Sequence, residues 1–121
     1  MEMKFYQCAH CGQIVAIVKK TGVPVICCGE PMKEIVAGTT DAAVEKHVPE
    51  YTIEGDEIVA RVNHVMEEDH YIEWIELVTD TEKIKVELKP GDEPVARFPY
   101  VKGSKIYEYC NKPGLWVKEV E

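Results

Sequence analysis

The sequence predicts an all-β protein with two domains, a small one organised by four cysteines and a larger β-sandwich. Four of the five cysteines lie within the first 28 residues of the 121-residue chain. The rest of the chain is a series of short apolar runs separated by turn residues, and no segment keeps helical periodicity for more than two turns. We place the boundary after residue 36, which gives domains over residues 1–36 and 37–121.

The small domain is too short to bury a core that would stabilise it alone, so it needs a metal ion or a cross-link. Cys8 and Cys11 form a C-x-x-C loop, Cys27 and Cys28 are adjacent, and a strand is predicted between the pairs over residues 14–18. The odd cysteine count and the lack of an apolar signal sequence favour thiolate ligands over disulfides. Four thiolates can surround one iron or zinc ion, and the adjacent pair should distort the tetrahedron.

The larger domain is predicted to consist of strands, because apolar residues alternate with polar ones between turns. Its first part, over residues 37–50, has little periodicity and is expected to be a linker and a loop. Strands are expected over residues 58–64, 70–78, 84–88, 95–98 and 106–109, and from residue 115 onward. Many short strands with regular turns are typical of a β-sandwich.

The charge balance limits the classes of partner. The chain has 22 acidic and 14 basic residues, for a formal net charge of -8. This argues against binding to nucleic acid or to an anionic membrane, both of which need a basic surface. No stretch is long and apolar enough to span a bilayer, and we expect a cytoplasmic protein. A small anionic substrate would need positive charge close to its site.

A second metal site is predicted in the larger domain. Its candidate ligands are three histidines and the fifth cysteine: His47, His64, His70 and Cys110. His64 and His70 flank one polar turn, so they can meet at one end of two neighbouring strands, and Cys110 ends a strand. Imidazoles with one thiolate suit iron, copper or zinc. A thiolate opposite an open position favours redox chemistry of oxygen species at iron.

Two charged residues precede His47 directly. Lys46 is a cation beside a predicted ligand in an acidic protein, so it is a candidate to attract a small anion. An ordinary solvated pair of loop charges, formed by Glu45 and Lys46, explains the same two residues equally well.

These motifs together resemble those of the desulfoferrodoxins, the two-iron superoxide reductases. C-x-x-C-G followed by V-x-C-C-G-E-P-M resembles their desulforedoxin domain, a small rubredoxin-like four-cysteine iron domain. E-K-H-V-P, N-H-V-M-E-x-D-H-Y-I-x-W-I and Y-C-N-x-x-G-L-W resemble their neelaredoxin-like catalytic domain, an immunoglobulin-like β-sandwich. The resemblance spans nearly the whole chain.

The resemblance implies two mononuclear iron sites and a detoxifying reaction, the one-electron reduction of superoxide to hydrogen peroxide. By position, three of the four iron-binding histidines and the axial cysteine of the family match His47, His64, His70 and Cys110. Glu45 matches the glutamate that closes the oxidised iron, and Lys46 matches the lysine that attracts superoxide. The resemblance also implies an external electron donor, such as a rubredoxin-type protein, and a homodimer.

One position departs from the family motif C-N-x-H-G-L-W. Here Pro113 stands where the fourth histidine is expected, and proline offers neither an imidazole nor a backbone N–H. We still expect His47, His64, His70 and Cys110 to bind one metal ion, with solvent or a carboxylate in the missing place. The alternatives are a non-enzymatic iron-binding electron-transfer protein with an altered second site, a site that holds zinc in place of iron, and a zinc-stapled interaction module.

Overall fold

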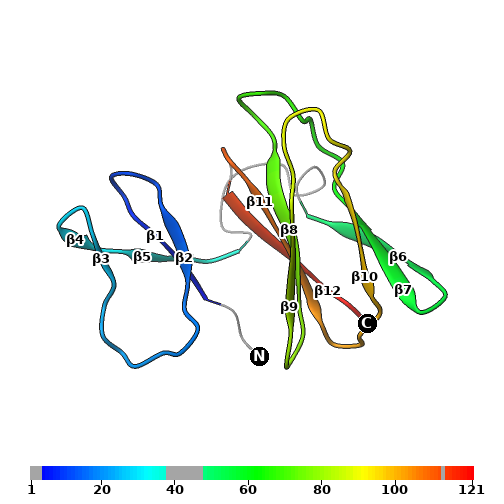
Figure 1. Cartoon of the computed structure of the whole chain (residues 1–121), viewed down its shortest axis with the longest axis horizontal. Helices are drawn as coiled ribbons and strands as arrows, with labels where there is room; N and C mark the ends of the chain where they lie inside the picture. The colour runs from blue at the N-terminus through cyan, green and yellow to red at the C-terminus, as the bar shows by residue number, and fades with distance from the viewer. Residues whose placement is uncertain (1–3, 38–47, 113) are drawn as a thin grey trace. The chain divides into compact units, whose positions relative to one another are not determined.

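The computed structural model describes residues 4–37, 48–112 and 114–121, and it divides the chain into two compact units, residues 2–36 and 37–121. Every regular element of the described residues is a strand (Figure 1). The prediction of an all-β protein is therefore confirmed. The described part of the chain contains no helix that is long and apolar enough to cross a membrane.

The smaller unit has one three-stranded and one two-stranded antiparallel sheet. The first sheet has the order β2-β1-β5 and consists of β1 (Phe5–Gln7), β2 (Ile14–Ala16) and β5 (Lys33–Ile35). The second pairs β3 (Ile26–Cys27) with β4 (Glu30–Pro31). Among the described residues of this unit, the buried side chains are those of Phe5, Cys8 and Met32. So small a core agrees with the expected need for a metal ion.

The larger unit is a sandwich of a three-stranded and a four-stranded antiparallel sheet, as in immunoglobulin constant-type domains. The first sheet has the order β10-β7-β6 and contains β6 (Glu50–Glu54), β7 (Glu57–Arg61) and β10 (Val95–Pro99). The second has the order β12-β11-β8-β9 and contains β8 (Ile72–Val78), β9 (Lys83–Glu87), β11 (Lys105–Cys110) and β12 (Gly114–Glu119).

The core of the sandwich follows the two-residue period of its strands. Side chains from both sheets form one buried cluster that includes Ile58, Phe98, Ile75, Leu77 and Ile106, each at most 1% exposed. Cys110 belongs to the same cluster, at the end of β11. The thiol is therefore fixed by the packing of the core, as a precise site requires.

One strand prediction was wrong in detail, and one strand was not predicted. The strand expected over residues 58–64 ends at Arg61, and Val62 still donates to the carbonyl of Pro94. Proline has no N–H to return a bond, so the ladder stops there and His64 lies in the connection to β8. Strand β6 was not predicted, because most of its side chains are exposed at the sheet edge and show no clear apolar alternation.

Candidate metal centres

The four cysteines of the smaller unit converge on one point. Their sulfur atoms all lie within 4.8 Å of one another, and all four are free thiols. The sulfurs of Cys11 and Cys27 are 3.7 Å apart. Four sulfurs about 2.3 Å from one ion stand roughly 3.8 Å apart in a tetrahedron, so the group has the dimensions of a metal site.

Backbone N–H groups stabilise the first thiolate of this group. The N–H of Cys11 points at the sulfur of Cys8 from 3.5 Å, within a turn closed by a bond from the N–H of Gly12 to the carbonyl of Cys8. The N–H groups of Cys11 and then His10 lower the pKa of Cys8 to about 6. Cys8 is thus prepared to act as a ligand.

The remaining thiols of the group need a cation to ionise together. Hydrogen bonds with Cys8 and Cys11 raise the pKa of Cys27 to about 12, and the same two neighbours raise the pKa of Cys28. Several negative sulfurs at this separation repel one another, and a bound divalent ion removes the penalty. The donor set therefore fits a thiolate-bound metal such as iron.

The turn that carries the adjacent cysteines Cys27 and Cys28 contains two left-handed residues in succession. Cys28 has a φ of 53° and Gly29 a φ of 79°, and Cys28 is the non-glycine residue with positive φ among those described. Neighbouring side chains in an extended chain point to opposite sides, whereas this turn lets Cys27 and Cys28 face the same point. A left-handed non-glycine residue costs about 1–2 kcal/mol.

His10 lies inside the C-x-x-C loop of Cys8 and Cys11 but does not belong to the group of candidate ligands. Its Nε2 is 3.1 Å from the carboxylate of Glu30, and both side chains are exposed. It is therefore a surface residue.

A second donor group lies at one end of the sandwich. The ligand atoms of His64, His70 and Cys110 are all within 4.8 Å of one another. The sulfur of Cys110 is 3.4 Å from Nε2 of His64, and the two imidazole rings meet edge to face with centroids 4.6 Å apart. The structure thus brings together three of the four residues predicted for this site.

Local backbone structure places these three side chains. Both histidines come from the connection between β7 and β8, where His70 and Glu67 exchange two backbone hydrogen bonds of 3.2 and 3.0 Å. Cys110 is the last residue of β11, and the pairing of β11 with β8 shifts between Tyr109 and Cys110. A bulge of this kind re-aims the side chain that follows it.

The imidazole nitrogens are arranged for metal binding. Nδ1 of His64 lies 2.6 Å from the carbonyl of Val65, so it must donate, which leaves the lone pair on Nε2 toward Cys110. Nε2 of His70 is buried and has no hydrogen-bond partner among the described residues. A buried nitrogen without a hydrogen bond lowers the stability of the fold unless something binds it. A metal ion beside Cys110 would bind this nitrogen.

Cys110 is fully buried, and its surroundings favour a cation. Burial raises the pKa of its thiol to about 11, and the backbone N–H of Lys112 opposes the shift by pointing at the sulfur. Glu108 shares the buried face of β11, and burial raises the pKa of its carboxyl to about 9. A divalent ion would stabilise the thiolate here. The thiolate and imidazole donors suit iron.

The comparisons with known proteins now identify the family. The family model described as desulfoferrodoxin matches residues 39–119, and that of the desulfoferrodoxin N-terminal domain matches residues 1–35. The chain belongs to the desulfoferrodoxin family. It is 49% identical to the desulfoferrodoxin of Nitratidesulfovibrio vulgaris over 123 residues, which cover 98% of this chain and 97% of the relative. It is 44% identical to a desulfoferrodoxin homolog of Archaeoglobus fulgidus over 118 residues, with 94% of each chain covered.

Solved structures of superoxide reductases resemble this one. The superoxide reductase of Treponema pallidum matches with a TM-score of 0.75 and 29% identity, covering 98% of this chain and all of that one. The superoxide reductase of Giardia intestinalis, described as 1Fe-SOR, matches with a TM-score of 0.52 and 33% identity over 61% of this chain and 95% of that chain. Membership of the desulfoferrodoxin family, together with the two donor groups, indicates that the chain binds iron.

Four residues singled out from the sequence lie outside the described residues: Glu45, Lys46, His47 and Pro113. Their roles remain predictions. Glu108 and Asn111 were not predicted as functional residues from the sequence. Alternation along β11 puts Glu108 on the same face as Cys110, a signal that was present in the sequence.

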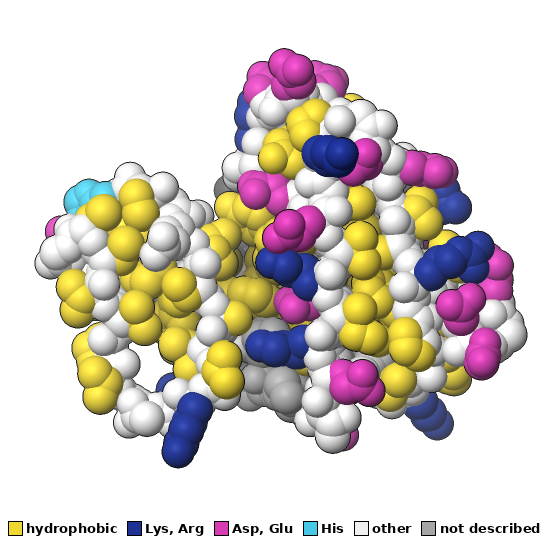
Figure 2. All heavy atoms as spheres, in the orientation of Figure 1, with side chains coloured by type: hydrophobic (Ala, Val, Ile, Leu, Met, Phe, Trp, Pro, Cys, Tyr) yellow, Lys and Arg dark blue, Asp and Glu magenta, His cyan; other side chains and the backbone are white. Residues whose placement is uncertain are grey.

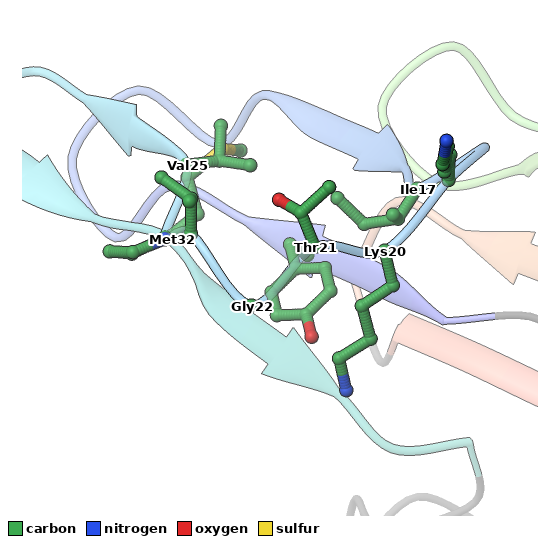
Figure 3. Close-up of a pocket in the computed structure, with 10 residues that line it drawn as sticks. Ile17, Lys20, Thr21, Gly22, Val25 and Met32 are labelled. Atoms are coloured by element: carbon green, nitrogen blue, oxygen red, sulfur yellow. The ribbon is translucent and has the colours of Figure 1, made fainter.

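The smaller unit also contains a cavity of about 510 Å³, which is shown with its lining residues in Figure 3. The loop that connects β2 to β3 forms much of its wall, and no cysteine lines it. Its walls are formed by Tyr6, Ile17, the loop residues 19–25 and Met32.

Proposed function

We propose that this protein is a superoxide reductase whose iron is held by His47, His64, His70 and Cys110. The observation that carries the proposal is the convergence of His64, His70 and the buried Cys110 at one end of the sandwich. Membership of the desulfoferrodoxin family and the likeness to solved superoxide reductases support it.

In this reaction each superoxide takes up one electron and two protons and becomes hydrogen peroxide. Iron in this site would supply the electron by passing from the ferrous to the ferric state. Cys110 is fully buried, whereas His64 and His70 are partly exposed. Superoxide therefore approaches from the side of the histidines, and Cys110 stays out of contact with water.

We expect Lys46 to attract superoxide and Glu45 to close the oxidised iron. The larger unit repels anions, because residues 37–121 contain 19 acidic and 10 basic residues. Figure 2 shows acidic side chains spread over the visible face of this unit. A cation beside His47 would offset this repulsion locally.

Replacing Lys46 by alanine is expected to slow the reaction with superoxide by about tenfold at low salt, because local attraction raises association rates by at least that factor. The dependence of the rate on ionic strength should also flatten. Both are measured by mixing reduced protein with pulse-generated superoxide. Lys102→Ala is the matched control, since Lys102 precedes β11 at the end opposite Cys110. Equal rates for the two variants at low salt would remove Lys46 from the mechanism.

The smaller unit is proposed to bind a second iron through Cys8, Cys11, Cys27 and Cys28, with a structural role and a role in electron relay. Cys28→Ser should abolish the ferric-thiolate absorption of this centre, because one sulfur ligand is lost from a strained turn. Cys110→Ser should leave that absorption unchanged. If the iron content and spectrum of the Cys28 variant equal those of the wild type, the assignment of this ligand is wrong.

A non-enzymatic electron-transfer protein is the second candidate. It is favoured by the contrast between the two sites: the first has all four ligands together, whereas Pro113 supplies no imidazole to the second. The deciding test is superoxide reduction by wild-type protein loaded with iron without oxygen. Iron bound in the smaller unit without superoxide reduction would favour this candidate. Zinc in place of iron is identified by metal analysis.

We further expect a cytoplasmic homodimer that is re-reduced by a small redox protein, such as a rubredoxin-type protein. The mass in solution, from sedimentation, tests the dimer. A monomer at micromolar concentration would contradict it.

A further inference from the structure

Asn111 follows Cys110 directly and binds the chain on both sides of His70. Its side-chain Nδ2 donates to the carbonyl of Asp69 at 3.0 Å, and its Oδ1 accepts from the N–H of Tyr71 at 3.0 Å. Its backbone N–H also donates to the carbonyl of Tyr71 at 3.3 Å. One residue next to the thiolate thus holds both neighbours of an imidazole donor.

These bonds begin where regular strand pairing ends. Cys110 is the last residue of β11 paired with β8, opposite Ile72, and the chain then turns into β12. A carboxamide carries the same donor and acceptor as a peptide group, so the side chain of Asn111 extends the ladder past the bulge. Its orientation is defined, because the N–H of Tyr71 needs an acceptor and the carbonyl of Asp69 needs a donor.

Other contacts of the His70 segment do not replace these bonds. The bridge between Glu67 and His70 closes the turn on itself but does not join it to β11. The ion pair between Lys112 and Asp69, at 3.9 Å, does connect this turn to the segment that follows β11, but both side chains are exposed. Exposed pairs of this kind contribute little to stability. Among the described residues, the hydrogen bonds of Asn111 therefore connect the His70 segment to the end of β11 more strongly than this ion pair does.

We propose that Asn111 is a positioning residue, which holds His70 at the distance from Cys110 at which both can bind one metal ion. This inference rests on the metal site of the proposed function and states how that site is assembled. It predicts that the hydrogen bonds of Asn111 set the affinity and the ligand geometry of this site, beyond any contribution to the stability of the fold.

The test is anaerobic titration of metal-free protein with Co²⁺, whose bands report thiolate and imidazole ligands. Asn111→Ala removes both side-chain bonds, and we expect the affinity of the His/Cys site to fall about 10–100-fold, as for other residues that orient ligands. The thiolate band of the loaded site should shift as well. Asn111→Asp keeps the acceptor for Tyr71 but loses the donor to Asp69, so it should show a smaller loss. The Cys110→Ser spectrum isolates the bands of the four-cysteine site, which should not change.

Asn63→Ala is the matched control. Asn63 is also adjacent to a ligand, His64, but is exposed and has no hydrogen bond with any described residue. Wild-type affinity and band position in both Asn111 variants would overturn the proposal. A lower melting temperature with an unchanged loaded site would do so too, since it would show a structural role only. Superoxide reduction is measured separately with iron, so failure of that reaction would reject the proposed function and leave the cobalt comparison valid.

Discussion

Replacement of Cys110 by serine is expected to reduce superoxide reduction at least about 100-fold, which corresponds to ~2.7 kcal/mol in the barrier. Serine has nearly the same shape, so the core around this fully buried position should survive. Its hydroxyl does not ionise near neutral pH and does not donate electron density as a thiolate does. The thiolate absorption of the second iron should disappear.

The control for this variant is internal. The four-cysteine centre lies in the other compact unit, so its absorption and iron content should equal those of the wild type. Stopped-flow rates with superoxide, recorded beside the visible spectrum, separate loss of the ligand from loss of the fold. A variant that keeps both the second thiolate band and the rate would show that Cys110 is not a ligand.

The sequence predicted the parts of both sites that follow from spacing. Cys8 and Cys11 are close in any chain with a turn between them, and His64 and His70 flank one connection. Cys110 was expected at a strand end, and it is the last residue of β11. These features depend on local geometry, which can be inferred from the order and spacing of residue types in the sequence.

Features that depend on tertiary structure were not predicted. The left-handed conformation of Cys28 is set by the need to bring two adjacent thiols to one point, which no propensity reveals. The contacts of Asn111 join segments 40 and 42 residues apart. Strand β6 has too few buried side chains to differ from a loop in its sequence. Each of these required knowledge of which segments are neighbours.

Replacement of Pro113 by histidine is expected to raise the iron occupancy of the second site. The turn between β11 and β12 is short, since Cys110 pairs with Gly114. A histidine at position 113 would therefore be close in the chain to Cys110. Structural zinc sites with four ligands have a binding free energy of about 10–16 kcal/mol. A contribution of only ~1.4 kcal/mol from one added imidazole would therefore raise the affinity tenfold. The thiolate absorption should then match that of the four-histidine family site.

Pro113→Ala separates the two effects of the proline. Alanine restores the backbone N–H but adds no imidazole, so it tests whether a second N–H···S bond joins the one from Lys112. That bond should make the Cys110 thiolate less electron-donating and raise the potential of the iron. Alanine should raise the potential without a gain in occupancy, whereas histidine should raise the occupancy. Redox titration and metal analysis of the wild type and both variants distinguish these outcomes. Equal iron occupancy in the wild type and the histidine variant would show that position 113 does not face the metal.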